Sequence, residues 1–127
     1  MNALLVDDNA FMMVIQSKLV AKLGADITEA SSGQSAIDLI KSQLFDFVLM
    51  DMMMPEMDGL ETTRRIRQFN HRVVIIGLSG NHTDEDIENC KIAGMNEVLA
   101  KPLDVLKLKN LLAGFGFETK EKIKVSK

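Results

Sequence analysis

The chain has 127 residues, a net charge of −3 and one cysteine, which is the size of a single domain with ordinary globular composition. This charge argues against a polyanion binder, no apolar stretch approaches the ~20 residues that span a bilayer, and the acidic start MNALLVDDN lacks the basic region of a signal peptide. The single Cys90 excludes an internal disulfide, so the sequence favours a reducing, cytoplasmic setting.

Short apolar runs alternate with helical patterns through the first half of the chain. Strands are expected at 3–6, 26–30 and 47–50. The stretch 10–23, closed by Gly24, is expected to form a helix that buries four apolar residues at a spacing of four: Phe11, Ile15, Leu19 and Leu23. After a turn at 31–33, a second helix is marked by Ala36, Ile37 and Ile40.

The second half of the chain continues the alternation. Asp58 is expected to cap a helix from Gly59 to about Phe69, and 73–78 is the clearest strand because it is rich in β-branched residues. The run 83–86 predicts the start of a helix that ends near 94, because its acids favour the positive end of the helix dipole. Residues 97–100 are expected to form a fifth strand and 104–113 a final helix.

Strand–helix units repeated in this way predict an α/β fold. Unalternated apolar strands separated by helices favour a parallel sheet covered on both faces. Right-handed crossovers place the carboxyl end of every strand at one edge, where open α/β sheets bind their ligands. The expected fold is therefore a doubly wound, five-stranded parallel sheet with its functional site at that edge.

Polar and charged residues stand at the carboxyl ends of four predicted strands. They are Asp7 and Asp8 after the first strand, Asp51 after the third, Ser79 and Gly80 after the fourth, and Lys101 after the fifth. Each alone is compatible with an ordinary capping or turn role. Together they predict that three carboxylates, a hydroxyl and an ammonium group meet at one edge of the sheet.

This set of groups suits phosphoryl transfer. Clustered carboxylates repel one another and need a hard cation, Mg²⁺ or Ca²⁺. Lys101 supplies a point charge for a phosphoryl group, Ser79 supplies a hydroxyl, and Gly80 exposes a backbone N–H without a side chain that would crowd an incoming group. Asp51 is the candidate nucleophile, which would form an aspartyl phosphate.

Four segments, in order and at matching separations, resemble the receiver domain of two-component response regulators. They are 6–9, 49–59, 78–80 and 101–102, and the most specific is the string D-x-x-M-P-x-M-D-G that begins at Asp51. The resemblance implies a flavodoxin-like (βα)5 fold with strand order 2-1-3-4-5. It also implies a receiver domain over 1–117, followed by a polar tail or linker stub over 118–127.

The resemblance further implies a phosphoacceptor and a metal site. Asp51 is the expected phosphoacceptor and Mg²⁺ the expected cofactor. The ion is expected to be bound directly by Asp8 and Asp51 and by the backbone carbonyl of Met53, with Asp7 acting largely through a bound water.

Other residues are implied to bind the phosphoryl group or to report its presence. Lys101 is expected to pair with the phosphoryl oxygens, beside the backbone N–H of Gly80. Ser79 is expected to swing toward the phosphoryl group and so report phosphorylation. Gly59 fits a backbone demand after the loop, where a Cβ would be awkward.

One position departs from the family pattern, and two are expected to set the lifetime of the phosphorylated form. The family often has an aromatic switch residue where this chain has Val98, so the usual coupling of a hydroxyl with a ring is in doubt here. Met53 and Asn81 occupy the places that help to position a hydrolytic water, and Met53 is a poor group for that task.

The function implied is that of a signalling receiver that takes a phosphoryl group from a histidine kinase or a histidine phosphotransfer protein. Such a protein catalyses only its own phosphorylation and dephosphorylation. An aspartyl-phosphate hydrolase is an alternative, but the second acid that it requires is replaced by Met53. A non-phosphorylated scaffold is the other alternative. No sequence feature supports contact with nucleic acid or membrane, and the output partner is not specified.

The remaining side chains singled out have structural interpretations. Met54 is expected to pack inward, and Met52 and Met53 to line the cleft, because thioethers are poor ligands beside hard carboxylates. Cys90 is expected to fill space on a helix. His71 and His82 are expected to lie in loops and to be solvated. Arg64, Arg65 and Arg67 are expected to form a solvated face of a helix.

Overall fold

A five-stranded parallel sheet in the order β2-β1-β3-β4-β5 forms the centre of the computed structural model, which describes residues 1–120. The strands are β1 (Asn2–Val6), β2 (Asp26–Ala30), β3 (Phe47–Asp51), β4 (Val74–Ser79) and β5 (Glu97–Ala100). Between and after them lie α1 (Ala10–Ala21), α2 (Gly33–Ser42), α3 (Gly59–Arg67), α4 (Asp84–Ala93) and α5 (Val105–Gly114). The predicted fold class and strand order are confirmed, and the predicted elements are all present with ends shifted by a few residues.

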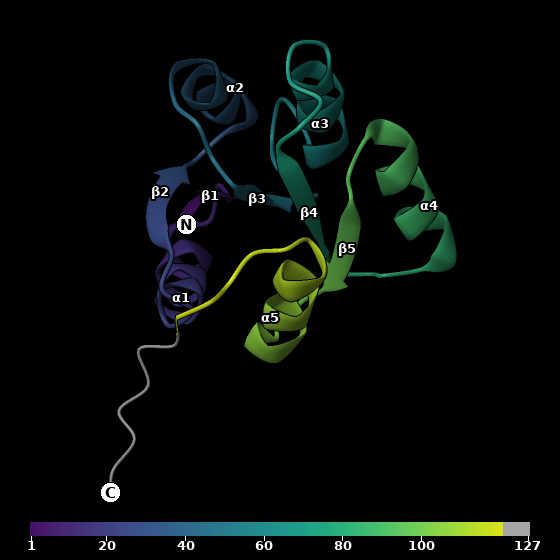
Figure 1. Ribbon diagram of the computed structural model, residues 1–127. Helices are drawn as coiled ribbons and strands as arrows, with labels where there is room; N and C mark the ends of the chain where they lie inside the picture. The colour runs from purple at the N-terminus through teal and green to yellow at the C-terminus, as the bar shows by residue number, and fades with distance from the viewer. Residues whose placement is uncertain (121–127) are drawn as a thin grey trace, which may run out of the picture.

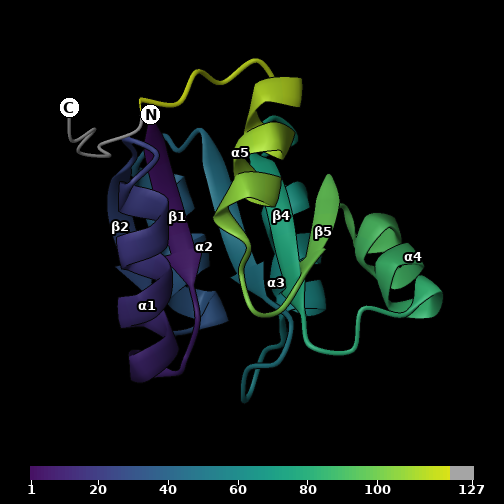
Figure 2. The same cartoon turned by 90° about the horizontal axis from the view of Figure 1, so that it is seen from below.

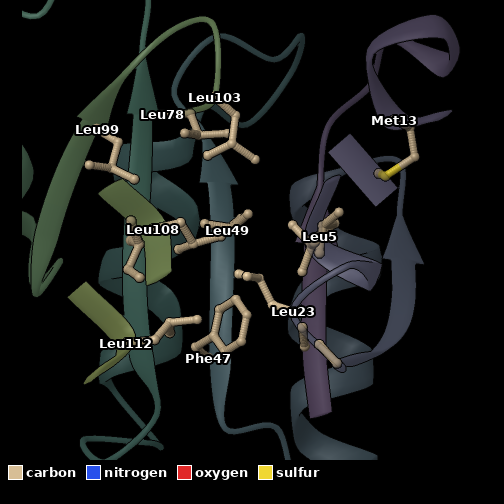
Figure 3. Packing of buried hydrophobic residues seen from close by; sticks show 14 residues of the cluster. Leu5, Met13, Leu23, Phe47, Leu49, Leu78, Leu99, Leu103, Leu108 and Leu112 are labelled. Carbon is tan, nitrogen blue, oxygen red and sulfur yellow. The ribbon is translucent and has the colours of Figure 1, made fainter. Parts of the chain in front are cut away.

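Helices cover both faces of the sheet. Helices α1 and α5 lie on one face, and α2, α3 and α4 on the other (Figures 1 and 2). Successive strand residues point to opposite faces, so Leu5, Phe47 and Leu49 pack toward α1 and α5, together with Leu108 and Leu112 of α5 (Figure 3). This burial explains why the central strands are continuously apolar.

A second core fills the space under α2, α3 and α4. Its centre is formed by alternate residues of the same strands, including Leu4, Val48 and Ile75, packed against Ile37 of α2 and Ile66 of α3. The two cores hold the sheet rigidly from both sides. The strand ends are therefore fixed relative to one another, and so are the residues that follow them.

Side-chain caps begin every helix close to the carboxyl edge of the sheet. Asn9 accepts a hydrogen bond from the backbone N–H of Met12 at 3.1 Å, and Asp58 accepts one from Glu61 at 2.8 Å, as predicted for Asp58. Such caps satisfy backbone donors that the first helical turn leaves free. They also stop each strand-to-helix loop at a defined residue, which keeps the edge compact.

The predicted buried face of α1 is only half right. Leu23 is buried and Leu19 packs against the core, but Phe11 is 73% exposed and Ile15 is 39% exposed. An α-helix turns 100° per residue, so residues at a spacing of four drift by about 40° at each step. The face that the sheet covers instead contains Met13, Gln16 and Val20.

Arg67 is not the solvated residue that the sequence predicts. Its Nε donates to the Gly94 carbonyl at 2.9 Å, Nη1 donates to the Asn70 carbonyl at 3.2 Å, and Nη2 donates to Asn96 Oδ1 at 2.9 Å. Burial lowers the pKa of its guanidinium group. Arg64 and Arg65, by contrast, are half-exposed and lie near Glu61, as expected.

No helix within residues 1–120 is both long and apolar enough to cross a membrane. The predicted tail begins inside the described part, where the Lys120 N–H donates to the Leu23 carbonyl at 2.9 Å. Its last residues, 121–127, lie outside the described residues.

The Arg67 contacts lead to a stability prediction. Because Arg67→Ala removes three hydrogen bonds that join α3 to the loops around β4 and β5, we expect it to lower the free energy of unfolding by about 2 kcal/mol. Arg64→Ala is the matched control, since it removes an exposed arginine of the same helix, and it should change the value by less than about 0.5 kcal/mol. Urea denaturation followed by circular dichroism measures both, and equal effects would show that the Arg67 contacts do not stabilise the fold.

Candidate functional site

Three carboxylates converge at the carboxyl edge of the sheet. Asp7 and Asp8 follow β1, Asp51 ends β3, and one oxygen from each lies within 4.8 Å of the others. The two strands are direct neighbours, with Val6 paired to Met50, so the acids meet because the strand register aligns their ends. In Figure 2 this edge lies along the bottom of the view, where the loop that follows β3 protrudes.

Asp7 is the most constrained of the three acids. Only 2% of the residue is exposed, and its carboxylate accepts hydrogen bonds from the Asn9 N–H at 2.9 Å and from Gln16 Nε2 at 3.4 Å. Burial raises the pKa of the Asp7 carboxyl; the Asn9 N–H opposes this effect, and the nearby Asp51 carboxylate adds to it. The charged cluster is thus unfavourable by itself, and its oxygen-only ligands fit a hard divalent cation.

Lys101 supplies the compensating charge within the protein. Its Nζ lies 2.6 Å from Asp51 Oδ1, and the carboxylate is almost fully buried. The Met53 N–H donates to the same oxygen at 3.3 Å. Lys101 is positioned by its place directly after β5, where its backbone N–H donates to the Ser79 carbonyl at 2.9 Å. Asp51 is therefore held through Oδ1, while Oδ2 takes part in neither contact.

Gly59 allows the start of α3 to approach the end of β3. A Cβ on Gly59 would lie 2.3 Å from the Asp51 carbonyl oxygen, too close for any other residue. Because glycine has no Cβ, the Gly59 N–H can donate to the Met52 carbonyl at 3.1 Å. The Met52 N–H in turn donates to the Leu78 carbonyl at 3.2 Å. The expected backbone demand at Gly59 is thus a demand for close approach, and it fixes the peptide that follows Asp51.

Ser79 and Gly80 stand at the end of β4, beside β3. Ser79 is buried, and its Oγ accepts a hydrogen bond from the His82 N–H at 3.0 Å. Gly80 is exposed, and a Cβ built on it meets no atom within 4 Å. The space above Gly80 is open, as a position that receives an incoming group requires.

The structure also places the other positions that the sequence singles out. Met53 is 78% exposed, Asn81 is also exposed, and Val98 is buried in the second core without an aromatic ring. Met52 does not line the cleft, because its side chain packs into that core with Sδ 3.3 Å from Cys90 Sγ. Met54 packs against the same core, and Cys90 is fully buried, as expected.

Sequence reasoning missed two residues that contact the site. Gln16 reaches Asp7 from the buried face of α1, and the signal in the sequence that marks it is its position on the same helix face as Met13 and Val20. His82 is expected to be solvated, but it is half-buried, and its φ is +45°. Its Nδ1 is enclosed and has no hydrogen-bond partner among the described residues 1–120. His71 is exposed, as predicted.

A groove opens beside the acidic cluster. It has a volume of about 430 Å³ and lies between α1 and the turn after β2, with Asp8, Val14 and Ser31 among its lining residues. On the same helix, Phe11 and Ile15 are exposed. The groove thus has both acidic and apolar residues in its lining.

Comparison with known proteins agrees with this geometry. A family model described as the response regulator receiver domain matches residues 3–113. The transcription factor SKN7 of Saccharomyces cerevisiae is 38% identical over 101 residues, which cover 80% of this chain and 16% of that protein. The chain spans less than a fifth of the length of this and other curated relatives that it matches.

Two solved structures share the fold. The receiver domain of sensor histidine kinase PA1611 from Pseudomonas aeruginosa PAO1, with a magnesium ion in its active site cleft, is 36% identical with a TM-score of 0.82, covering 89% of this chain and 94% of that one. The receiver domain of Saccharomyces cerevisiae Ssk1, in complex with the histidine phosphotransfer protein Ypd1, has a TM-score of 0.84 at 24% identity, covering 91% and 88%; at that identity the likeness concerns the fold. The matched family model, the relatives and the acidic edge agree, and the chain belongs to the response regulator receiver domains of two-component signalling systems.

Proposed function

We propose that Asp51 accepts a phosphoryl group from a phosphohistidine on a histidine kinase or a histidine phosphotransfer protein. The observation that supports this most directly is the placement of the Lys101 ammonium group 2.6 Å from Asp51, within a cluster of three carboxylates. A buried, cation-paired carboxylate at an open edge is suited to become a nucleophile. The same cation then neutralises charge that develops on the phosphoryl oxygens.

The reaction is a displacement at phosphorus. An oxygen of Asp51 attacks the phosphorus atom, the P–N bond of the phosphohistidine breaks, and the imidazole nitrogen leaves with the bonding electrons. Oδ2 is the candidate nucleophilic atom, because Oδ1 already contacts Lys101 and Met53. Ser79 and the Gly80 N–H, at the end of the neighbouring strand β4, are the groups proposed to bind the transferred phosphoryl group.

Mg²⁺ is the proposed cofactor. Asp8, Asp51 and the Met53 carbonyl are its proposed direct ligands, and Asp7 acts through a bound water. When bound, the ion offsets the negative charge of the cluster and of the phosphoryl oxygens. Asp7 orients that water, because the Asn9 and Gln16 contacts fix its carboxylate.

The two alternative functions receive less support. A hydrolase of aspartyl phosphates needs an acid two residues after its nucleophile, and the exposed Met53 at that place cannot transfer a proton. A scaffold that is never phosphorylated would not need a lysine paired with a buried acid. We therefore propose that the protein catalyses only its own phosphorylation and dephosphorylation. From the single cysteine we also propose that it acts in the cytoplasm.

We further propose that the phosphodonor protein docks over α1. Phe11 is 73% exposed, Val14 54% and Ile15 39%, and all three lie on the helix that begins beside the acidic cluster. Exposed apolar side chains grouped on one helix are typical of a protein contact surface. A donor seated there would bring its phosphohistidine to the edge that holds Asp51.

Replacement of Asp51 tests the central proposal. We expect Asp51→Asn to abolish phosphorylation by a small phosphodonor in Mg²⁺ while the fold is kept, because the change is nearly isosteric. Intact-mass spectrometry follows the phosphoryl group, and circular dichroism follows the fold. Asp58→Asn is the matched control, since asparagine also caps a helix, and it should be phosphorylated like the wild type. Phosphorylation of the Asp51→Asn protein at the wild-type rate would refute the assignment.

Replacement of Asp8 tests the metal site. The exposed Asp8 lies in the carboxylate cluster but makes little contact with the fold, so Asp8→Ala removes a ligand without disturbing the core. We expect Mg²⁺ affinity, measured by titration calorimetry, to fall at least about tenfold, since a ligating charge is lost. Asp46→Ala, outside the cluster, is the control. Equal Mg²⁺ affinity in the Asp8→Ala and wild-type proteins would mean that the ion binds elsewhere.

A charge on α1 tests the docking surface. We expect Ile15→Glu to slow phosphotransfer from a phosphorylated histidine phosphotransfer protein by about tenfold, because an apolar contact becomes a buried charge. Phosphorylation by a small phosphodonor should be unchanged. Ile92→Glu places the same charge at an apolar residue of α4 that is 75% exposed, and it should not affect either reaction. If both variants slow transfer equally, α1 is not the docking surface.

The lifetime of the phosphorylated form tests the role proposed for Met53. Met53 cannot orient an in-line water, and the neutral Asn81 cannot act as a base, so we expect the aspartyl phosphate to be long-lived. Met53→Asn should speed hydrolysis by about tenfold, or about 1.4 kcal/mol of barrier. The measurement is the loss of phosphate from purified phosphoprotein in Mg²⁺ buffer. Loss within seconds from the wild type, or slower loss from the variant, would contradict this account.

A further inference from the structure

The loop between β4 and α4 holds His82 in an unfavourable conformation. Its φ of +45° lies in the left-handed region, which is costly for a residue with a Cβ. Its imidazole Nδ1 is enclosed and has no hydrogen-bond partner within residues 1–120. Both features raise the free energy of this loop conformation, so something must hold the loop in place.

Ser79 provides that restraint. The His82 backbone N–H donates to Ser79 Oγ at 3.0 Å, and Ser79 itself is almost completely buried at the end of β4. The hydroxyl that stabilises the strained loop is thus the same hydroxyl that, under the proposed function, turns to bind a phosphoryl group on Asp51. One oxygen joins the reacting site to the start of α4.

Val98 makes the hydrogen bond between Ser79 and His82 important for signalling. The position where an aromatic switch residue was expected holds Val98, which is buried in the core and has no ring that could exchange between two positions. The change that follows phosphorylation must therefore use another element. The loop that contains His82 is hydrogen-bonded to the Ser79 hydroxyl through the His82 N–H. This loop leads into α4, whose N-cap is Thr83.

We propose that His82 is a positioning residue that stores strain in the unphosphorylated protein and releases it on phosphorylation. When Ser79 turns toward the phosphoryl group, the His82 N–H loses its acceptor, the residue leaves the left-handed region, and Nδ1 reaches solvent. The strain released favours the phosphorylated conformation, and it shifts the equilibrium between the two states by its own magnitude. This inference rests on the proposed function.

A pair of variants isolates the backbone strain. His82→Ala and His82→Gly both remove the imidazole, but only alanine keeps the Cβ that makes a positive φ costly. If the strain is released in the phosphorylated state, beryllium fluoride with Mg²⁺, which mimics a phosphoryl group, should bind His82→Ala about fivefold more tightly than His82→Gly. In its absence His82→Gly should be the more stable of the two to urea. Calorimetry is suited to the binding measurement, because the chain has no tryptophan or tyrosine.

Two controls separate this effect from strain in general. Glu56 is the other non-glycine residue with a positive φ within residues 1–120, at +66°, and Glu56→Ala and Glu56→Gly should bind beryllium fluoride equally. In a Ser79→Ala background the difference between the two His82 variants should disappear, because the hydroxyl that couples the loop to the site is gone. Persistence of the difference there would overturn the proposed route through Ser79.

The outcomes also distinguish this inference from the function on which it rests. Equal beryllium fluoride affinities of His82→Ala and His82→Gly, with tight binding to the wild type, would overturn the inference alone. Failure of the wild-type protein to bind beryllium fluoride in Mg²⁺ would overturn the proposed function, and the role of His82 with it.

Discussion

Repulsion among three carboxylates within 4.8 Å of one another is the constraint around which this molecule is arranged. The backbone brings the acids together because β1 and β3 are adjacent and end in register. Lys101 compensates part of the charge through its contact with Asp51. Hydrogen bonds from Asn9 and Gln16 hold Asp7 in place despite the cost of burial. Because the carboxylates repel one another, binding of a cation at this edge would stabilise the site.

The two sides of the site are held with different firmness. After β3, the backbone at Met52 is hydrogen-bonded to both β4 and α3, and the close approach of Gly59 leaves that loop little freedom. After β4, by contrast, Gly80 is unobstructed, and the loop depends on a bond between His82 and Ser79. Local opening favours segments with few buried contacts. The loop after β3 is therefore held by more backbone contacts than the loop after β4, in line with the proposal that the β4 side responds to phosphorylation.

The packing beneath Asp51 gives α4 a second link to the site. The side chain of Met52, the residue after Asp51, contacts Cys90 of α4. On the same face of the sheet, the Met95 side chain occupies the space that a Cβ on Gly77 would take. Sulfur-containing side chains adapt their shape more readily than branched ones. This packing joins α4 to the residue that directly follows Asp51. Val98 is buried in the same core and has no aromatic ring that could exchange between a buried and an exposed position.

The order of elements, the fold class and the set of polar residues that meet at the carboxyl edge were determined by the sequence itself. Parallel α/β topology places every strand end at one edge, so the acids and Lys101 could be assigned to one site from their positions after strands. The string from Asp51 to Gly59 was specific enough to indicate the family. These features depend on local pattern and on topology, both of which are written along the chain.

Only the tertiary structure decided which faces and which partners the side chains use. The apolar residues of α1 surround the helix, and contact with the sheet selects Met13, Gln16 and Val20 over Phe11 and Ile15. Arg67 finds its acceptors near β4 and β5, up to 29 residues away in sequence. The positive φ of His82 is held by a hydrogen bond from its N–H to Ser79 Oγ within one loop conformation. Each depends on distances between segments that only folding brings together, so no spacing along the chain could have specified it.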